Sequence, residues 1–187
     1  MVAALTPGLA RSASRLRSGT HFISENRGAA AVEFALVAAP FLALLLALLQ
    51  TALVFFAGRV LDDTTEEASR YILTGQAQTA NMTQSGFANW VCGKTYALFT
   101  CGNFMINVQN YASFAAANTG PPSLTFDSKG NVTNSWTYAP GNPGDIVVVQ
   151  VMYQWPVYLG PLAFNLANLS NGNRLLVSTA VFKNEPY

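Results

Sequence analysis

The feature that most constrains this chain is an uncharged apolar run from Phe34 to Ala57. Within its 24 residues, only Pro40, Gln50 and Thr51 are neither apolar nor small. A helix rises 1.5 Å per residue, so such a run reaches about 36 Å and can cross a hydrocarbon core of about 30 Å. We therefore expect one membrane-spanning helix.

The charges around the run indicate its orientation. Residues 1–28 carry four arginines and one glutamate, namely Arg11, Arg15, Arg17, Arg27 and Glu25. Because basic residues beside a span stay in the cytoplasm, the N-terminus is expected inside the cell and the chain after Gly58 outside the membrane. Beyond Arg70 only seven charged side chains remain, and no basic stripe exists outside the leader, so nucleic-acid binding is not expected.

Two simpler interpretations of the run compete. A secretory signal peptide has an apolar region of about 7–15 residues and ends at a small-x-small cleavage site. This run is longer, and no convincing site follows "FFAG". An ordinary signal anchor fits the length, with Glu33 merely reaching the cytoplasmic interface, and this alternative stays open.

The stretch "NRGAAAVEF" places one carboxylate, Glu33, just before the run. If the chain is cut after Gly28, Ala29 becomes the first residue of the mature chain and Glu33 the fifth. An arginine before a glycine, small residues, a glutamate at the fifth position and Phe34 beside it resemble the cleavage signal of type IV prepilins. The resemblance implies cutting by prepilin peptidase on the cytoplasmic side, and it gives Glu33 a role in subunit registration within a filament.

Further stretches narrow the resemblance. Pro40 falls at the twelfth mature position, where it removes one helix hydrogen bond and can bend the span. Paired Cys92 and Cys101 lie near the stretches "CGNFMINVQNYASF" and "PGDIVVVQVMYQWPVY", and the chain ends in "VFKNEPY". Together these features look like the TadE-like proteins, pseudopilins of the tight-adherence (Flp, type IVb) pilus system.

This resemblance implies a minor pilin or pseudopilin that takes part in pilus assembly and surface adherence. Its implied partners are prepilin peptidase, other pilins and the inner-membrane platform proteins of the pilus. Its implied location is the bacterial inner membrane, as a single-pass protein that enters an extracellular pilus. The alternative is an uncleaved, membrane-anchored assembly factor with a periplasmic binding domain.

The span is expected to continue as a helix until Gly75, a suitable helix stop. Two i,i+4 ion pairs, Arg59–Asp63 and Glu66–Arg70, are expected to support it. Three apolar residues recur near helical spacing and are expected to face the globular part: Leu61, Ala68 and Ile72. A second helix is expected near residues 84–98, with a packing face made of Phe87, Trp90, Val91 and Leu98.

The two cysteines, Cys92 and Cys101, follow the pattern C-x8-C. Because exported chains with two cysteines usually bridge them, we expect a structural disulfide, worth about 2–3 kcal/mol. A metal site is less suitable, since the only histidine is His21 in the leader. Redox catalysis favours C-x-x-C instead.

Beyond Cys101 the hydrophobic pattern alternates, which predicts strands. The stretch "FMINVQNY" places Phe104, Ile106 and Val108 on one face, and "RLLVSTAVF" supplies a last strand. Residues 123–138 predict two strands joined near Lys129–Gly130. In "DIVVVQVMYQW", Gln150 and Gln154 are expected on a partly wet face, opposite Val147, Val149, Val151, Tyr153 and Trp155.

The predicted fold class is α+β: a long N-terminal transmembrane helix continues into a pilin-like globular domain with a small antiparallel sheet of four or five strands. The expected organisation is a basic cytoplasmic leader over residues 1–28, a transmembrane and assembly helix over 29–58, and a periplasmic or extracellular domain over 59–187.

No catalytic, cofactor-binding or metal-binding residues are expected. The exported part holds no histidine for a Ser-His-Asp or Cys-His arrangement. Asp62, Asp63, Glu66 and Glu67 lack the spacing of a calcium loop and are expected to form a solvated helix face. Six aromatic residues are assigned mostly to core packing rather than to an adhesive surface: Tyr96, Trp136, Tyr138, Tyr153, Trp155 and Tyr158.

Overall fold

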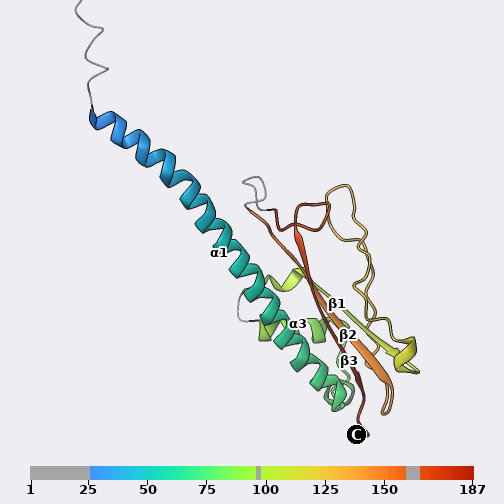
Figure 1. The fold of residues 1–187 in the computed structure, drawn as a ribbon. Helices are drawn as coiled ribbons and strands as arrows, with labels where there is room; N and C mark the ends of the chain where they lie inside the picture. The colour runs from blue at the N-terminus through green and yellow to red at the C-terminus, as the bar shows by residue number, and fades with distance from the viewer. Residues whose placement is uncertain (1–25, 96–97, 159–164) are drawn as a thin grey trace, which may run out of the picture. The chain divides into compact units, whose positions relative to one another are not determined.

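The computed structural model describes residues 26–95, 98–158 and 165–187. In chain order the α-helices and strands are α1 (Asn26–Leu73), α2 (Gln76–Thr79), α3 (Gln84–Lys94), β1 (Phe104–Tyr111), β2 (Ile146–Trp155) and β3 (Arg174–Lys183). Figure 1 shows the long helix α1 beside the strands. The strands form one antiparallel sheet in the order β1-β2-β3. The predicted α+β fold is confirmed.

Contacts between Cα atoms divide the chain into two units, residues 1–42 and residues 43–187. The described part of the first unit, residues 26–42, lies entirely in α1. The second unit holds the rest of α1, the shorter helices and the sheet.

The C-terminal half of α1 lies along the sheet (Figure 1). It packs there through one apolar stripe of side chains. Leu61, Ala68 and Ile72 are at most 1% exposed, as predicted, because their spacing of seven and four residues keeps them on one side of the helix. The helix stops where predicted, since Gly75 has a φ of 75° and its N–H donates to the carbonyl of Ile72 at 2.9 Å.

The central strand β2 is buried on both faces, which explains its nearly continuous apolar sequence. Val147, Val149 and Val151 are fully buried on the face that belongs to the main core. The opposite face was predicted to be partly wet. That prediction is wrong for Gln150, which is 4% exposed, because its side-chain amide donates to the carbonyl of Gly120 at 2.8 Å and accepts from Asn107 at 3.2 Å.

The predicted strands over residues 123–138 are also wrong, so the described sheet has three strands rather than four or five. Only isolated bridges join Phe126 to Val132 and Val108 to Tyr138. Backbone bonds still close a short hairpin, since the N–H of Asp127 donates to the carbonyl of Asn131 and the N–H of Thr133 to that of Thr125, both at 2.9 Å. The Asn134 side chain adds to this pairing by accepting from the N–H of Thr125 at 2.7 Å. The predicted turn near Gly130 is present, with a φ of 81° at that residue.

Two local predictions need correction. Arg59 pairs with Asp62 at 3.9 Å rather than with Asp63, whereas the Glu66–Arg70 pair is confirmed at 3.3 Å. The second helix ends at Lys94 instead of Leu98, because both the N–H and the hydroxyl of Thr95 bond the carbonyl of Cys92 and close the last turn.

Candidate assembly and processing site

The predicted processing and assembly residues all lie in the first described turns of α1. Gly28, Ala29, Glu33, Phe34 and Pro40 are exposed, and Phe34 retains 76% of its surface. A Cβ atom built at Gly28 meets nothing within 4 Å, so packing does not require a glycine there. Pro40 lies inside the helix, as expected from the run.

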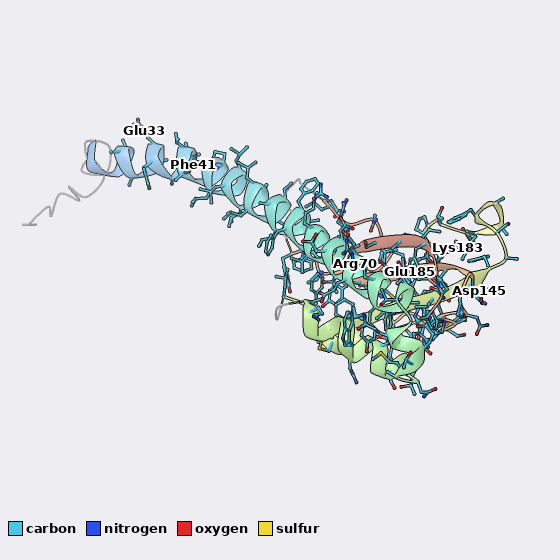
Figure 2. All side chains as sticks on the ribbon, turned by 90° about the horizontal axis from the view of Figure 1, so that it is seen from below. Glu33, Phe41, Arg70, Asp145, Lys183 and Glu185 are labelled. Carbon is cyan, nitrogen blue, oxygen red and sulfur yellow. A yellow bond between two sulfur atoms is a disulfide. The ribbon has the colours of Figure 1, made fainter. Side chains whose placement is uncertain are left out.

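Glu33 is the one charged side chain among residues 28–58 (Figure 2). The described residues give it no ion pair or hydrogen bond. Its neighbours along the helix are apolar, so its carboxylate would be costly to bury in lipid without a cation beside it. The geometry therefore leaves this carboxylate available to a partner outside the chain.

The apolar run exposes its large side chains on all sides of the helix before Gln50. The exposed members range from 39% to 76% and include Val32, Phe34, Leu36, Val37, Phe41, Leu42, Leu44, Leu45, Leu46, Leu48 and Leu49. A continuous apolar surface of this size is typical of contact with a membrane or another protein. By length and composition, the helix over Gly28–Leu73 is able to cross a membrane, with a peak mean hydropathy of 2.5.

The apolar run changes character in its last two turns. Val54 and Ala57 are at most 6% exposed because the globular part of the second unit covers them. On the other side of the same turns, Leu53, Phe55 and Phe56 remain 52% to 71% exposed. The globular part thus begins to cover the helix before the apolar run has ended.

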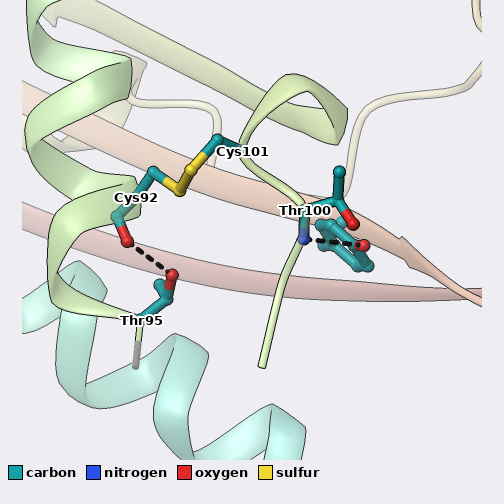
Figure 3. The surroundings of a disulfide bond; sticks show 5 residues. Cys92, Thr95, Thr100 and Cys101 are labelled. Atoms are coloured by element: carbon teal, nitrogen blue, oxygen red, sulfur yellow. Dashed lines mark hydrogen bonds between the residues drawn. A yellow bond between two sulfur atoms is a disulfide. The ribbon is translucent and has the colours of Figure 1, made fainter. Parts of the chain in front are cut away.

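The predicted disulfide between Cys92 and Cys101 is confirmed, with its Cα atoms 5.4 Å apart (Figure 3). It joins the last turn of α3 to the short helical turn before β1. Between the two cysteines, the N–H of Thr100 donates to the hydroxyl of Tyr153 at 3.3 Å, which ties the bridged segment to the sheet. The bond is placed to stabilise the fold rather than to react.

The C-terminal residues close onto the end of α1, a contact that the sequence analysis did not predict. The N–H of Glu185 donates to the carbonyl of Leu73 at 3.0 Å, so it satisfies one of the helix's last acceptors. Asn184 is 3% exposed, and its side-chain amide donates to the carbonyls of Pro140 and Asn142. The polar ending "KNEP" gave no periodic signal from which this packing could have been deduced.

Burial, and then the nearby Asp145, raises the pKa of Tyr187, and two further groups outside the apolar run also have a shifted pKa. Burial, and to a smaller extent the neighbouring Tyr71, raises the pKa of Tyr138 to about 12. The Tyr138 hydroxyl has no hydrogen-bond partner among the described residues. At the exposed turn, the side-chain and backbone N–H groups of Asn131 lower the pKa of Asp127. Neither group lies in a cluster that indicates acid–base catalysis, and the described residues contain no group of three metal-ligating side chains.

The segment that carries the exposed apolar surface and Glu33 is also the one that matches a known protein family. Residues 28–70 match the model of the TadE-like protein family. The match confirms the predicted resemblance to the TadE-like family over this segment. The TadE-like segment begins at Gly28, the residue after which cleavage was predicted, and ends at Arg70 near the end of α1. Comparisons with curated proteins and with solved structures gave no match.

Proposed function

We propose that this protein is a minor pilin or pseudopilin of a tight-adherence pilus, with a structural rather than an enzymatic role. It is inserted into the inner membrane with its N-terminus in the cytoplasm, cut by prepilin peptidase after Gly28, and recruited into the pilus or its base through its apolar helix. The observation that carries the proposal is the family match over residues 28–70, on a helix whose large apolar side chains before Gln50 are exposed.

The cut would supply a positively charged partner for the Glu33 carboxylate. Cleavage after Gly28 creates an α-amino group at Ala29, a cation with an ordinary pKa near 8. If that amine of one subunit lies beside Glu33 of the next, two groups that are each costly in apolar surroundings become paired. A slip of one helical turn leaves both unpaired, at about 2.5–3.5 kcal/mol for a carboxylate deep in the span. The pair therefore favours one register of subunits.

The size of the second unit supports a minor rather than a major subunit. The main subunits of such pili are expected to be little more than one hydrophobic helix, whereas this chain carries a folded unit over residues 43–187. An additional folded domain suits a component used in few copies, such as one that starts assembly or sits at a filament end. Adherence would then be a consequence of assembly.

Processing is tested by the mass of the protein extracted from cells that express the matching peptidase. The expected chain begins at Ala29, and loss of four arginines and one glutamate changes its side-chain net charge from +1 to −2. Gly28→Leu is expected to retain the leader. Gly58→Leu is the matched control, since a Cβ atom at either glycine meets nothing within 4 Å. A wild-type chain that keeps its leader contradicts the proposal and favours the uncleaved anchor.

Incorporation is tested on sheared pili. Glu33→Gln is expected to reduce the amount of this protein in the filament fraction at least tenfold, because the register-selecting pair is lost. Asp63→Asn is the control, since it removes a carboxylate of the same helix that has no ion pair in the described structure. Equal incorporation of Glu33→Gln and wild type would remove the pairing argument.

A further inference from the structure

A cleft of about 600 Å³ opens at one end of the sheet, within the second unit. It lies where β1 begins, β2 ends and the turn before β3 approaches the loop around Gly130. These segments come together because antiparallel pairing places the start of β1 beside the end of β2, and the end of β2 beside the start of β3. The cleft therefore draws on four separate parts of the chain.

Carboxamides are the most frequent side chains in the lining of the cleft, at five of its twelve residues. Its amide residues are Asn103, Asn131, Gln154, Asn171 and Asn173, and we call it the amide cleft. Trp136 and Phe104 are the aromatic residues of the lining, although the Phe104 ring packs against Phe99 and Tyr153 in the core, and Lys129 is the only charged residue among those that line it. Such a lining is rich in neutral donors and acceptors.

Several of these amides are held in place by one another. The Asn171 side chain donates to Gln154 Oε1 at 2.7 Å and to the carbonyl of Gly130 at 3.2 Å. Asn173 also donates to Gln154 Oε1, at 3.4 Å. Gly130 adopts a φ of 81°, a left-handed conformation that favours glycine, and it holds its carbonyl where Asn171 bonds it. The amide cleft is thus preorganised before any ligand binds.

Other lining groups remain available. Within the described residues, no hydrogen bond is made by the side chain of Asn103, by the indole N–H of Trp136 or by Lys129 Nζ. Asn131 donates to Asp127 at 2.9 Å, which leaves its amide oxygen as an acceptor. These groups can bond a ligand without breaking a bond of the fold.

This combination suits a sugar ring. Carboxamides offer a donor and an acceptor side by side, which matches the neighbouring hydroxyl or acetamido groups of a pyranose. An aromatic ring provides a flat apolar surface for the face of that ring. A nucleotide or a divalent cation would need a cluster of charges that the lining lacks. A cleft of this volume also fits the range typical of small-molecule sites.

We propose that the amide cleft binds an oligosaccharide, with Trp136 stacking on one sugar ring and Asn103 bonding its hydroxyl or acetamido groups. Lys129 lies at the cleft to pair with a carboxylate when the sugar is acidic. This site goes beyond the pilus role proposed above and does not depend on cleavage after Gly28, because all of its residues lie in the second unit. Its failure is therefore distinguishable from failure of the pilin proposal.

The test uses the full chain in lipid nanodiscs, free of sugar-based detergents, against immobilised chains of neutral hexoses, N-acetylhexosamines and uronic acids. At least one class is expected to bind. Binding of N-acetylhexosamine chains would indicate a cell-wall type of glycan, and binding of uronic acid chains would indicate an acidic surface polysaccharide. Trp136→Ala and Asn103→Ala are each expected to weaken binding at least tenfold. Asn89→Ala, on the exposed side of α3, is the control and is expected to leave binding within twofold.

Lys129→Ala separates the two kinds of sugar. It is expected to weaken binding of uronic acid chains at least fivefold and to leave neutral chains within twofold. Absence of binding to all three classes, or equal binding by the Trp136→Ala variant and the wild type, would overturn the proposal. Binding of peptides without binding of any saccharide would overturn it as well.

Discussion

The contact between Gly75 and the C-terminal tyrosine allows a sharp test of how α1 is closed. Gly75 has a φ of 75°, and a Cβ atom built there lies 2.2 Å from the ring of Tyr187. In Gly75→Ala the alanine must therefore adopt a left-handed conformation and displace the ring. The left-handed conformation costs about 1–2 kcal/mol.

The displaced ring adds a second cost. Tyr187 is 48% exposed, so about half of its surface is buried. That half amounts to about 100 Å², worth about 2.5 kcal/mol as an upper figure. Gly75→Ala is thus expected to lower the free energy of unfolding by up to about 4 kcal/mol, and Tyr187→Ala by up to about 2.5 kcal/mol. The double variant is expected to be no less stable than Gly75→Ala alone, because both changes remove the same ring contact.

The assay is denaturant unfolding of the full chain in micelles, followed by tryptophan fluorescence. Trp90 reports on this region because its ring lies 4.7 Å from that of Tyr71 on α1. Gly144→Ala is the control: its φ is 86°, but a Cβ atom there meets nothing within 4 Å, so it should add its cost independently of Tyr187→Ala. Additive losses in the Gly75 and Tyr187 pair would refute the reasoning.

Three other changes test the packing of the second unit. Phe87→Ala empties a fully buried site and is expected to cost about 3–5 kcal/mol by the same unfolding assay, with a loss below 1 kcal/mol contradicting the assigned packing. Replacing Cys92 and Cys101 by serine is expected to lower stability by about 2–3 kcal/mol in oxidising buffer, and reductant should then no longer affect the midpoint. The pKa of Tyr138 in the folded protein, about 12, exceeds the ordinary value of 10.0, so folding favours the un-ionised hydroxyl. This contribution to stability is complete below pH 10 and is lost as pH rises through 12. The loss is about 1–2 kcal/mol after allowance for the partial exposure of the side chain. Tyr138→Phe is expected to abolish that loss in unfolding measured from pH 9 to 12, and to be neutral or stabilising at pH 7 because the buried hydroxyl has no described partner.

The elements predicted correctly are those whose pattern follows from local physics. The stripe through Leu61, Ala68 and Ile72 has helical spacing, and β2 is a run of β-branched residues, so each specifies its element without help from distant parts. The disulfide could be predicted because the sequence has only two cysteines, Cys92 and Cys101, and they lie close together in the part expected to be exported.

The errors arise where pairing depends on contacts that the hydrophobic pattern does not show. The stretch 123–138 alternates like a strand and closes a short hairpin through backbone bonds, but its bridges stay isolated and it adds no strand to the sheet. Gln150 is polar, yet it is buried because Asn107 and the carbonyl of Gly120 satisfy its amide. The two partners of Gln150 lie 43 and 30 positions away in the sequence, so no periodicity in the sequence reveals these hydrogen bonds. The amide cleft was missed for the same reason. The roles of Gly28, Ala29, Glu33, Phe34 and Pro40 remain predictions.

The early covering of α1 has a consequence for residence in a bilayer. Only Phe34–Leu49 present apolar side chains around the whole helix, and 16 residues span about 24 Å, against a hydrocarbon core of about 30 Å. From Gln50 to Ala57 only one side of the helix exposes apolar side chains, because the globular part covers the other side, so lipid could contact that one side alone. A membrane helix whose fully apolar part is shorter than the hydrocarbon core favours local thinning of the bilayer, at a cost of a fraction of a kcal/mol per Å of mismatch. If the protein acts as the pilin proposed above, leaving the bilayer for a filament would remove this mismatch, so the incomplete fit of the helix to the membrane would favour its transfer.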